Sequence, residues 1–332
     1  MKKFIKKIID GILERKSEIT FEEAIELIEY DFEKDKDSLK VLLDGANKIR
    51  ETFHGDIFDL CTIVNAKSGN CSEDCRYCAQ SSYYNTAADV YDLMNKNKIL
   101  ELAKDMETKL VDKFSLVTSG RGLNIGCELE SLKEIYVELK NETSLHLCAS
   151  HGIIDFEVAK ELKNSGVQMY HHNLETSRKF YDEICTTHTY EDRIQTCKNA
   201  KKAGLKVCSG GILGLGETKK DRVEMAFELK KLEVDSVPIN ILTPIEGTPL
   251  ALEIIEELTP LEVVKTIAIY RLILPNTFIR YAGGRQLLGD YEIIGVNSGV
   301  NGALTGNYLT TTGSTIERDR MIFKEAGFEF KR

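Results

Sequence analysis

Three cysteines lie within a run of eight residues, Cys71-Ser-Glu-Asp-Cys75-Arg-Tyr-Cys78. Their spacing, with three and then two intervening residues, allows one tight loop to direct all three thiols at a single small object. Thiolates are soft ligands that bind zinc, copper(I) and iron–sulfur clusters. The run therefore predicts a metal site whose protein ligands are cysteine sulfurs.

The number of cysteines favours a cluster over a single zinc ion. A structural zinc site has four closed ligands and usually a further Cys-x-x-Cys pair, which this sequence lacks. The nearest spare thiol, Cys61, falls within a predicted strand, where burial explains it. A four-iron cube normally takes one cysteine per iron, so three cysteines leave one iron open to a substrate or cofactor. We therefore expect a [4Fe–4S] cluster at Cys71, Cys75 and Cys78.

Composition excludes several other classes of protein. Of 332 residues, 42% are hydrophobic and 29% are charged, as in ordinary folded globular proteins. The net charge of −9 argues against a general nucleic-acid-binding surface. No apolar run approaches the ~20 residues of a membrane span, and residues 1–16 have the spacing of an amphipathic helix. Nine cysteines without a secretory leader favour a reducing compartment, so we expect a cytoplasmic protein.

The elements that must position the cysteine loop alternate between strands and helices. The first fifty residues show helical patterns only, with a capping box at Thr20 and Glu23. Candidate strands then cover residues 57–64, 113–118, 144–149, 167–173, 206–212, 236–242, 277–281 and 303–309. Candidate helices cover residues 88–106, 128–140, 155–164, 190–202, 219–231 and 260–274. Such alternation predicts parallel strands.

About eight strand–helix units fit an α/β fold of the (β/α)8 TIM type, here with an N-terminal helical extension. A doubly wound open sheet is the competing architecture. The barrel is favoured because polar or sulfur side chains stand near the C-terminal ends of successive strands, and these ends meet at one mouth of a barrel. They are Ser115, Cys148, Asn173, Cys208, Asn240 and Arg280. We divide the chain into a helical segment at 1–52, a core barrel at 53–281 and a barrel-completing region at 282–332.

The cysteine loop, with Tyr77 immediately before its third cysteine, resembles that of the radical S-adenosylmethionine enzymes. This resemblance implies that the open iron chelates S-adenosylmethionine. One electron then cleaves the cofactor to methionine and a 5′-deoxyadenosyl radical. Composition and spacing do not show this chemistry.

Longer runs are similar to the biotin synthase family within that superfamily, and their order and spacing are kept. The runs are Asn65-Ala-Lys-Ser-Gly-Asn through Ser82, Tyr170-His-His-Asn-Leu-Glu-Thr176, Thr186-Thr-His-Thr-Tyr190, Val207-Cys-Ser-Gly-Gly-Ile212, Gly214-Leu-Gly-Glu-Thr218 and Ser236-Val-Pro-Ile-Asn240. The resemblance implies sulfur insertion into dethiobiotin to form biotin, a sulfurtransferase activity. The C-terminal region then corresponds to the biotin and thiamin synthesis-associated type.

The same resemblance implies a second, auxiliary iron–sulfur cluster inside the barrel, of the [2Fe–2S] type in this family. Cys148, Cys208 and Arg280 match three of its ligands, but Ser115 stands at the place of the remaining cysteine. A serine hydroxyl is a harder and less acidic ligand than a thiol. Three interpretations stay open: an oxygen ligand, another thiol such as Cys127 or Cys185, or a different auxiliary cluster.

Further roles are also implied by the resemblance. Tyr77, Glu175, Arg193 and Gly214 match residues around S-adenosylmethionine, with Glu175 toward the ribose hydroxyls and Arg193 toward the methionine carboxylate. Asn173 and Asn240, which can donate and accept hydrogen bonds, match residues that contact dethiobiotin. His171 replaces the asparagine that is usual at its place.

The expected partners are dethiobiotin, an electron donor such as flavodoxin or ferredoxin, and a second copy in a homodimer, with no nucleic acid or membrane. Two alternatives remain from the sequence. One is a radical enzyme without sulfur insertion, of the hydrogenase-maturation or carbon-skeleton type. The other is a metal-stabilised binding protein without turnover.

Overall fold

Eight parallel strands close into a barrel in the computed structural model, which describes residues 1–253, 258–306 and 313–330. Closure is complete because β9 pairs with both β8 and β1. The eight strands are β1 (Ile57–Lys67), β2 (Lys113–Thr118), β3 (His146–Ser150), β4 (Met169–His171), β5 (Lys206–Cys208), β7 (Ser236–Ile241), β8 (Phe278–Tyr281) and β9 (Gly302–Leu304). The expected (β/α)8 barrel is confirmed, and the open sheet is excluded.

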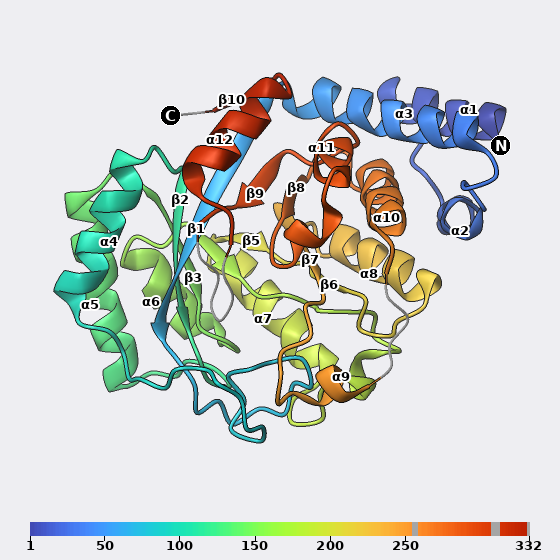
Figure 1. The fold of residues 1–332 in the computed structure, drawn as a ribbon. Helices are drawn as coiled ribbons and strands as arrows, with labels where there is room; N and C mark the ends of the chain where they lie inside the picture. The colour runs from blue at the N-terminus through green and yellow to red at the C-terminus, as the bar shows by residue number, and fades with distance from the viewer. Residues whose placement is uncertain (254–257, 307–312, 331–332) are drawn as a thin grey trace.

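Helices surround the barrel between successive strands (Figure 1). They are α4 (Lys96–Thr108), α5 (Cys127–Glu142), α6 (Phe156–Asn164), α7 (Tyr190–Lys202), α8 (Lys219–Lys231) and α10 (Pro260–Ile273). The smaller elements are α9 (Pro249–Leu252), α11 (Tyr291–Val296), α12 (Ile316–Glu325), β10 (Glu329–Phe330), and the 3-10 turns η1 (Tyr181–Glu183) and η2 (Arg285–Leu288). In the described part of the chain, no helix is both long and apolar enough to cross a bilayer.

Two expected elements differ from the structure near the site. The helix expected at 88–106 begins only at Lys96, because the preceding residues extend the cysteine loop and pair Tyr91 with Ser68. The strand expected at 206–212 is divided into β5 and β6 (Gly211–Leu213). At the break, a Cβ on Gly210 would lie 2.1 Å from the Pro238 carbonyl oxygen, so the close approach of β7 requires glycine there.

Two other strands end earlier than expected. β4 covers only Met169–His171 of the segment 167–173. β9 ends at Leu304, and residues 307–309 of its expected range lie outside the described residues. Barrel strands therefore stand on both sides of residue 281, and the three-part division of the chain stays a prediction.

The N-terminal helices lie at the end of the barrel where β1 begins, opposite the cysteine loop (Figure 1). These are α1 (Lys2–Leu13), α2 (Phe21–Glu29) and α3 (Lys36–His54). The expected capping box begins α2, where Thr20 and Glu23 exchange hydrogen bonds. Helix α3 packs on α1 and α10, while α2 packs on α8 and α10. The extension therefore covers one end of the barrel and leaves the other end to the site.

Arg271 joins several segments at this covered end. Its side chain is fully buried, and Nε and Nη2 donate to the Gly299 carbonyl at 3.0 and 2.7 Å. Nη1 donates to the Thr277 carbonyl at 2.7 Å, and Nη2 also reaches Asn301 Oδ1 at 3.0 Å. One guanidinium thus satisfies acceptors from the segments on both sides of β8.

We expect Arg271→Met to lower the free energy of unfolding by about 3 kcal/mol or more. Each buried acceptor that loses its donor costs about 1–3 kcal/mol. Chemical denaturation followed by circular dichroism would measure the change. The matched control is Arg178→Met, whose side chain is 54% exposed and whose ion pair with Glu191 is worth at most about 1 kcal/mol. Equal losses in the two variants would contradict this role.

Candidate active site

The cysteine loop follows β1 at the C-terminal mouth of the barrel, and hydrogen bonds that Gln80 accepts hold its base. The Cys71 amide donates to the Gln80 carbonyl at 3.0 Å, and Gln80 Oε1 accepts from the Gly69 amide at 3.1 Å. Gly69 has a φ of +74°, and a Cβ there would lie 2.6 Å from Val90. Glycine is therefore needed where the loop leaves the strand.

A second segment, residues 184–189, is hydrogen-bonded to the middle of the cysteine loop. The Asp74 carboxylate accepts from the Thr186 and Thr187 amides at 2.9 and 3.1 Å, and the Arg76 amide donates to the Ile184 carbonyl at 3.0 Å. Burial opposes ionisation of Asp74, but these hydrogen bonds lower its pKa overall. The run beginning at Thr186 therefore orients the cysteine loop.

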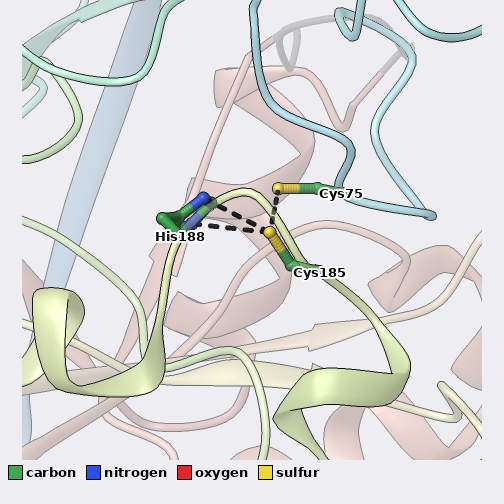
Figure 2. Close-up of side chains that lie close together, drawn as sticks. All are labelled: Cys75, Cys185 and His188. Carbon is green, nitrogen blue, oxygen red and sulfur yellow. Dashed lines mark hydrogen bonds between the residues drawn. The ribbon is translucent and has the colours of Figure 1, made fainter.

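Cys75 points toward two side chains of this segment, Cys185 and His188 (Figure 2). The Cys185 sulfur lies 3.7 Å from the Cys75 sulfur and 3.3 Å from His188 Nδ1. Hydrogen bonding between the two thiols raises the pKa of Cys75 and lowers the pKa of Cys185. His188 Nδ1 also lies 2.6 Å from Glu73 Oε2.

Cys75, Cys185 and His188 form a group of three possible metal ligands. Among the described residues, it is the one such group whose ligand atoms all lie within 4.8 Å of one another. The thiols of Cys71, Cys75 and Cys78 are thus spread around a larger space than one ion occupies. Sequence reasoning missed Cys185 and His188 here, because 110 residues separate Cys185 from Cys75.

The two thiols considered as replacements for Ser115 both lie elsewhere. Cys185 lies at the cysteine loop, and Cys127 is exposed at the start of α5. Neither thiol is therefore placed in the barrel interior with Ser115.

A cavity of about 330 Å³ connects the cysteine loop with the barrel interior. Of the predicted site residues it is lined by Cys71, Cys75, Tyr77, Cys78, Asn173, Glu175, Arg193, Cys208, Asn240 and Arg280. A neighbouring cavity of about 260 Å³ shares part of this lining, including Tyr77, Glu175 and Asn240. Most of the predicted residues therefore surround one continuous space. Ser115, Cys148 and Gly214 stand outside its lining.

Glu175 and Arg193 face one another in this cavity. The distance from Arg193 Nη1 to Glu175 Oε1 is 3.6 Å, and Arg193 Nε donates to the Tyr181 hydroxyl at 2.5 Å. Burial raises the pKa of Glu175, while Arg193 and a hydrogen bond from Tyr77 oppose the shift. Glu175 has a φ of 70°, which is rare for a residue other than glycine. The Leu174 and Glu175 amides donate hydrogen bonds to the Gly210 carbonyl, and these keep the backbone in this conformation.

Asn240 on β7 and Asn173, which follows the end of β4 by two residues, line the cavity, and backbone contacts orient both amides. Asn173 Oδ1 accepts from the Gly210 amide at 3.2 Å. Asn240 Oδ1 accepts from the Gly283 amide at 2.9 Å, and its Nδ2 donates to the Gly211 carbonyl at 3.2 Å. Both side chains therefore also perform the capping role that strand ends require.

Deeper in the barrel, Arg280 is held by two of its guanidinium nitrogens. Nε donates to Ser236 Oγ at 2.8 Å and Nη2 to Asp59 Oδ1 at 2.9 Å. Ser115 is paired in register with Cys148, and all of these residues are at most 2% exposed. The expected ligand residues thus share one water-poor interior.

Several buried polar atoms in this interior have no hydrogen-bond partner among the described residues. They include Ser115 Oγ, His171 Nε2, Glu175 Oε2 and Arg280 Nη1. Native interiors satisfy nearly all such groups, so these atoms indicate a binding site for further groups. Burial also lowers the pKa of His171 to about 3, so this imidazole is neutral at physiological pH. The soft thiols in this interior suit iron–sulfur clusters.

Comparison of the backbone with solved structures shows how widely this fold occurs. Methylornithine synthase superposes with a TM-score of 0.83 at 20% identity, covering 99% of this chain and 97% of that one. HydG, a maturase of the [FeFe]-hydrogenase, gives a TM-score of 0.83 at 18% identity, covering 99% and 76%. These likenesses support the fold alone.

Sequence comparison is more specific. Residues 66–229 match the Radical SAM superfamily, and residues 238–329 match the Biotin and Thiamin Synthesis associated domain. The biotin synthase of Clostridioides difficile (strain 630) is 54% identical over 99% of this chain and 100% of its own length. That of Fusobacterium nucleatum is also 54% identical, over 99% and 91%. With this identity along its whole length, the chain belongs to the biotin synthase family of radical S-adenosylmethionine enzymes.

Proposed function

We propose that this enzyme converts dethiobiotin to biotin by inserting sulfur between two unactivated carbons. The observation that carries the proposal is the single cavity whose lining runs from the cysteine loop to Cys208 and Arg280. A substrate in this cavity would touch both the site of hydrogen abstraction and the source of sulfur. Family membership at 54% identity supports the same substrate and product.

Cys71, Cys75 and Cys78 would hold the [4Fe–4S] cluster of the family. When S-adenosylmethionine binds there, the pair supplies a one-electron route to a radical that takes hydrogen from carbon lacking an acidic proton. The protein's part is to keep the three thiols at the mouth of the barrel. Gln80 does so from one side, and the segment 184–189 does so from the other.

Glu175 and Arg193 would bind S-adenosylmethionine beside this cluster. Glu175 Oε2 is buried without a partner among the described residues, so it is available to accept a hydrogen bond from a ribose hydroxyl. Arg193 lines the same cavity, and a guanidinium suits the methionine carboxylate. Tyr77 lines this region, and Gly214, whose φ is +92°, would lie near the cofactor as the resemblance implies.

Cys148, Cys208, Arg280 and the position of Ser115 would surround an auxiliary iron–sulfur cluster, of the [2Fe–2S] type that the resemblance implies. Such a cluster would be the store of sulfur. The unpaired Arg280 Nη1 supports this placement, because a buried guanidinium donor requires an acceptor or a ligand. Asn173 and Asn240 would orient the ureido ring of dethiobiotin, since both amides line the cavity.

Partners and location follow from the same proposal. An external electron donor, such as flavodoxin or ferredoxin, is required because the reaction consumes electrons. All nine cysteines are free, which supports a reducing compartment such as the cytoplasm. The homodimer stays a prediction that native mass spectrometry would test.

The radical enzyme without sulfur insertion is the second candidate, because methylornithine synthase and the hydrogenase maturase share this fold. Their identity to this chain is 20% and 18%, against 54% for two biotin synthases. The interior thiols Cys148 and Cys208 also favour sulfur insertion. We therefore retain the biotin synthase activity as the conclusion.

Anaerobic protein reconstituted with iron and sulfide is expected to convert dethiobiotin to biotin. The assay needs S-adenosylmethionine and a reductant, and mass spectrometry would detect the sulfur in the product. Omitting S-adenosylmethionine serves as the control. If 5′-deoxyadenosine accumulates while the product contains no added sulfur, the second candidate replaces the first.

Cys75→Ala should abolish formation of 5′-deoxyadenosine, because the cluster would lose one of only three protein ligands. Chromatographic quantification of the nucleoside measures this directly. Cys127→Ala is the matched control, since its thiol is exposed at the start of α5, and it should retain wild-type formation. Undiminished deoxyadenosine from the Cys75 variant would show that the loop does not hold the radical-generating cluster.

Glu175→Gln should weaken binding of S-adenosylmethionine about tenfold, which corresponds to ~1.4 kcal/mol. The change removes a charged acceptor from a buried hydrogen bond to a hydroxyl. Anaerobic equilibrium dialysis of the reconstituted protein gives the dissociation constant. Glu191→Gln, at a side chain that is 57% exposed, should leave it unchanged. An unchanged constant for the Glu175 variant would remove this residue from the cofactor site.

A further inference from the structure

The barrel interior contains one thiol that the resemblance does not account for. Of the nine cysteines, all within the described residues, Cys61, Cys148 and Cys208 lie on barrel strands. The others lie in the cysteine loop, in the segment 184–189, or on helices. Cys197, for example, belongs to α7, and its thiol lies 3.5 Å from the His172 carbonyl. Cys61 is therefore the one additional thiol within the sheet.

Asp59 determines which face of β1 points inward. Its carboxylate accepts from Lys113 Nζ at 2.6 Å and from Arg280 Nη2 at 2.9 Å, and both partners are buried. Alternate residues of a strand share a face, so Cys61, two positions later, points to the same interior. Its side chain is 1% exposed, and it lines the cavity together with Cys208 and Arg280.

Cys61 also contacts a residue of the expected auxiliary site. The thiol of Cys148, which belongs to β3, lies close enough to interact with the Cys61 thiol. Ser115 on β2 is in register with Cys148 on one side and with Ile63 on the other. Cys61 and Ile63 are consecutive inward positions of β1. Cys61 is therefore the inward-facing residue of β1 next to Ile63, and Ile63 is the residue that pairs with Ser115.

Two unpartnered groups indicate that a ligand belongs in this place. Arg280 Nη1 is buried and lines the cavity, and Ser115 Oγ is fully buried, yet neither has a hydrogen-bond partner among the described residues. The Ser115 hydroxyl thus makes no hydrogen bond to any described protein group. Iron in iron–sulfur clusters is normally bound by thiolates, which Cys61 supplies and Ser115 does not.

We propose that Cys61 replaces the missing cysteine, so that Cys61, Cys148, Cys208 and Arg280 hold the auxiliary cluster. Each thiol would lose its proton on binding iron. Ser115 is then a small neutral neighbour of the cluster. This inference rests on the proposed function, because it assumes that an auxiliary cluster is present.

Cys61→Ala should remove the auxiliary cluster and leave the first cluster intact. After anaerobic reconstitution, Mössbauer spectra with iron and sulfide analysis would show only the iron of one four-iron cube, ~4 per chain. Electron paramagnetic resonance of the reduced protein with S-adenosylmethionine would still show the first cluster. Ser115→Ala should retain both clusters. So should Cys197→Ala, a control at another buried thiol.

A double variant distinguishes the loss of a cluster ligand from a general folding defect in Cys61→Ala. Adding Ser115→Cys to Cys61→Ala places a thiol at the family position and should restore the auxiliary spectrum. The inference is overturned if Cys61→Ala keeps the wild-type auxiliary spectrum, or if Ser115→Ala alone removes it. Wild-type protein with the first cluster only would overturn the proposed sulfur source together with this inference. If Cys61→Ala retains the auxiliary cluster, this inference fails but the proposed source of sulfur does not.

Discussion

One buried carboxylate, that of Asp59, sets the geometry of the barrel interior. It joins three strands, because Lys113 on β2 and Arg280 on β8 both donate to it. An unpaired charge in such a place would cost several kcal/mol, so the three side chains constrain one another. Arg280 consequently keeps one nitrogen directed away from the protein partners, and β1 keeps one face inward. Arg280 and the inward face of β1 therefore bound the space proposed for the auxiliary cluster.

The opposite end of the cavity is organised by hydrogen bonds to backbone groups. The cysteine loop has little regular secondary structure, yet Gln80 and Asp74 connect it to groups both near and far along the chain. Asp74 accepts from consecutive amides of residues 186 and 187, which is an arrangement that a shifted loop could not keep. The barrel therefore supplies a rigid interior, while the loop is held in place by polar contacts at its mouth.

Sequence patterns predicted the barrel and most of its strands, because strand–helix alternation reports local structure and parallel pairing. They could not predict which side chains meet. Cys61 was explained by burial alone, since periodicity gives the face of a strand but not its neighbours. The contact of Cys185 with Cys75 depends on chain closure over 110 residues. Strand ends were also misjudged where glycine permits close backbone approach, as at Gly210.

The barrel does not select the reaction, because methylornithine synthase and a hydrogenase maturase share it at 20% identity or less. Selection must come from the side chains that a given sequence directs into the interior. Neighbouring parallel strands present their inward positions to a common space, so a ligand lost from one strand can be supplied by the next. A cluster requires converging donors at suitable distances and does not require a particular strand. A serine on β2 with a thiol on β1 is therefore chemically consistent with the retained fold and family.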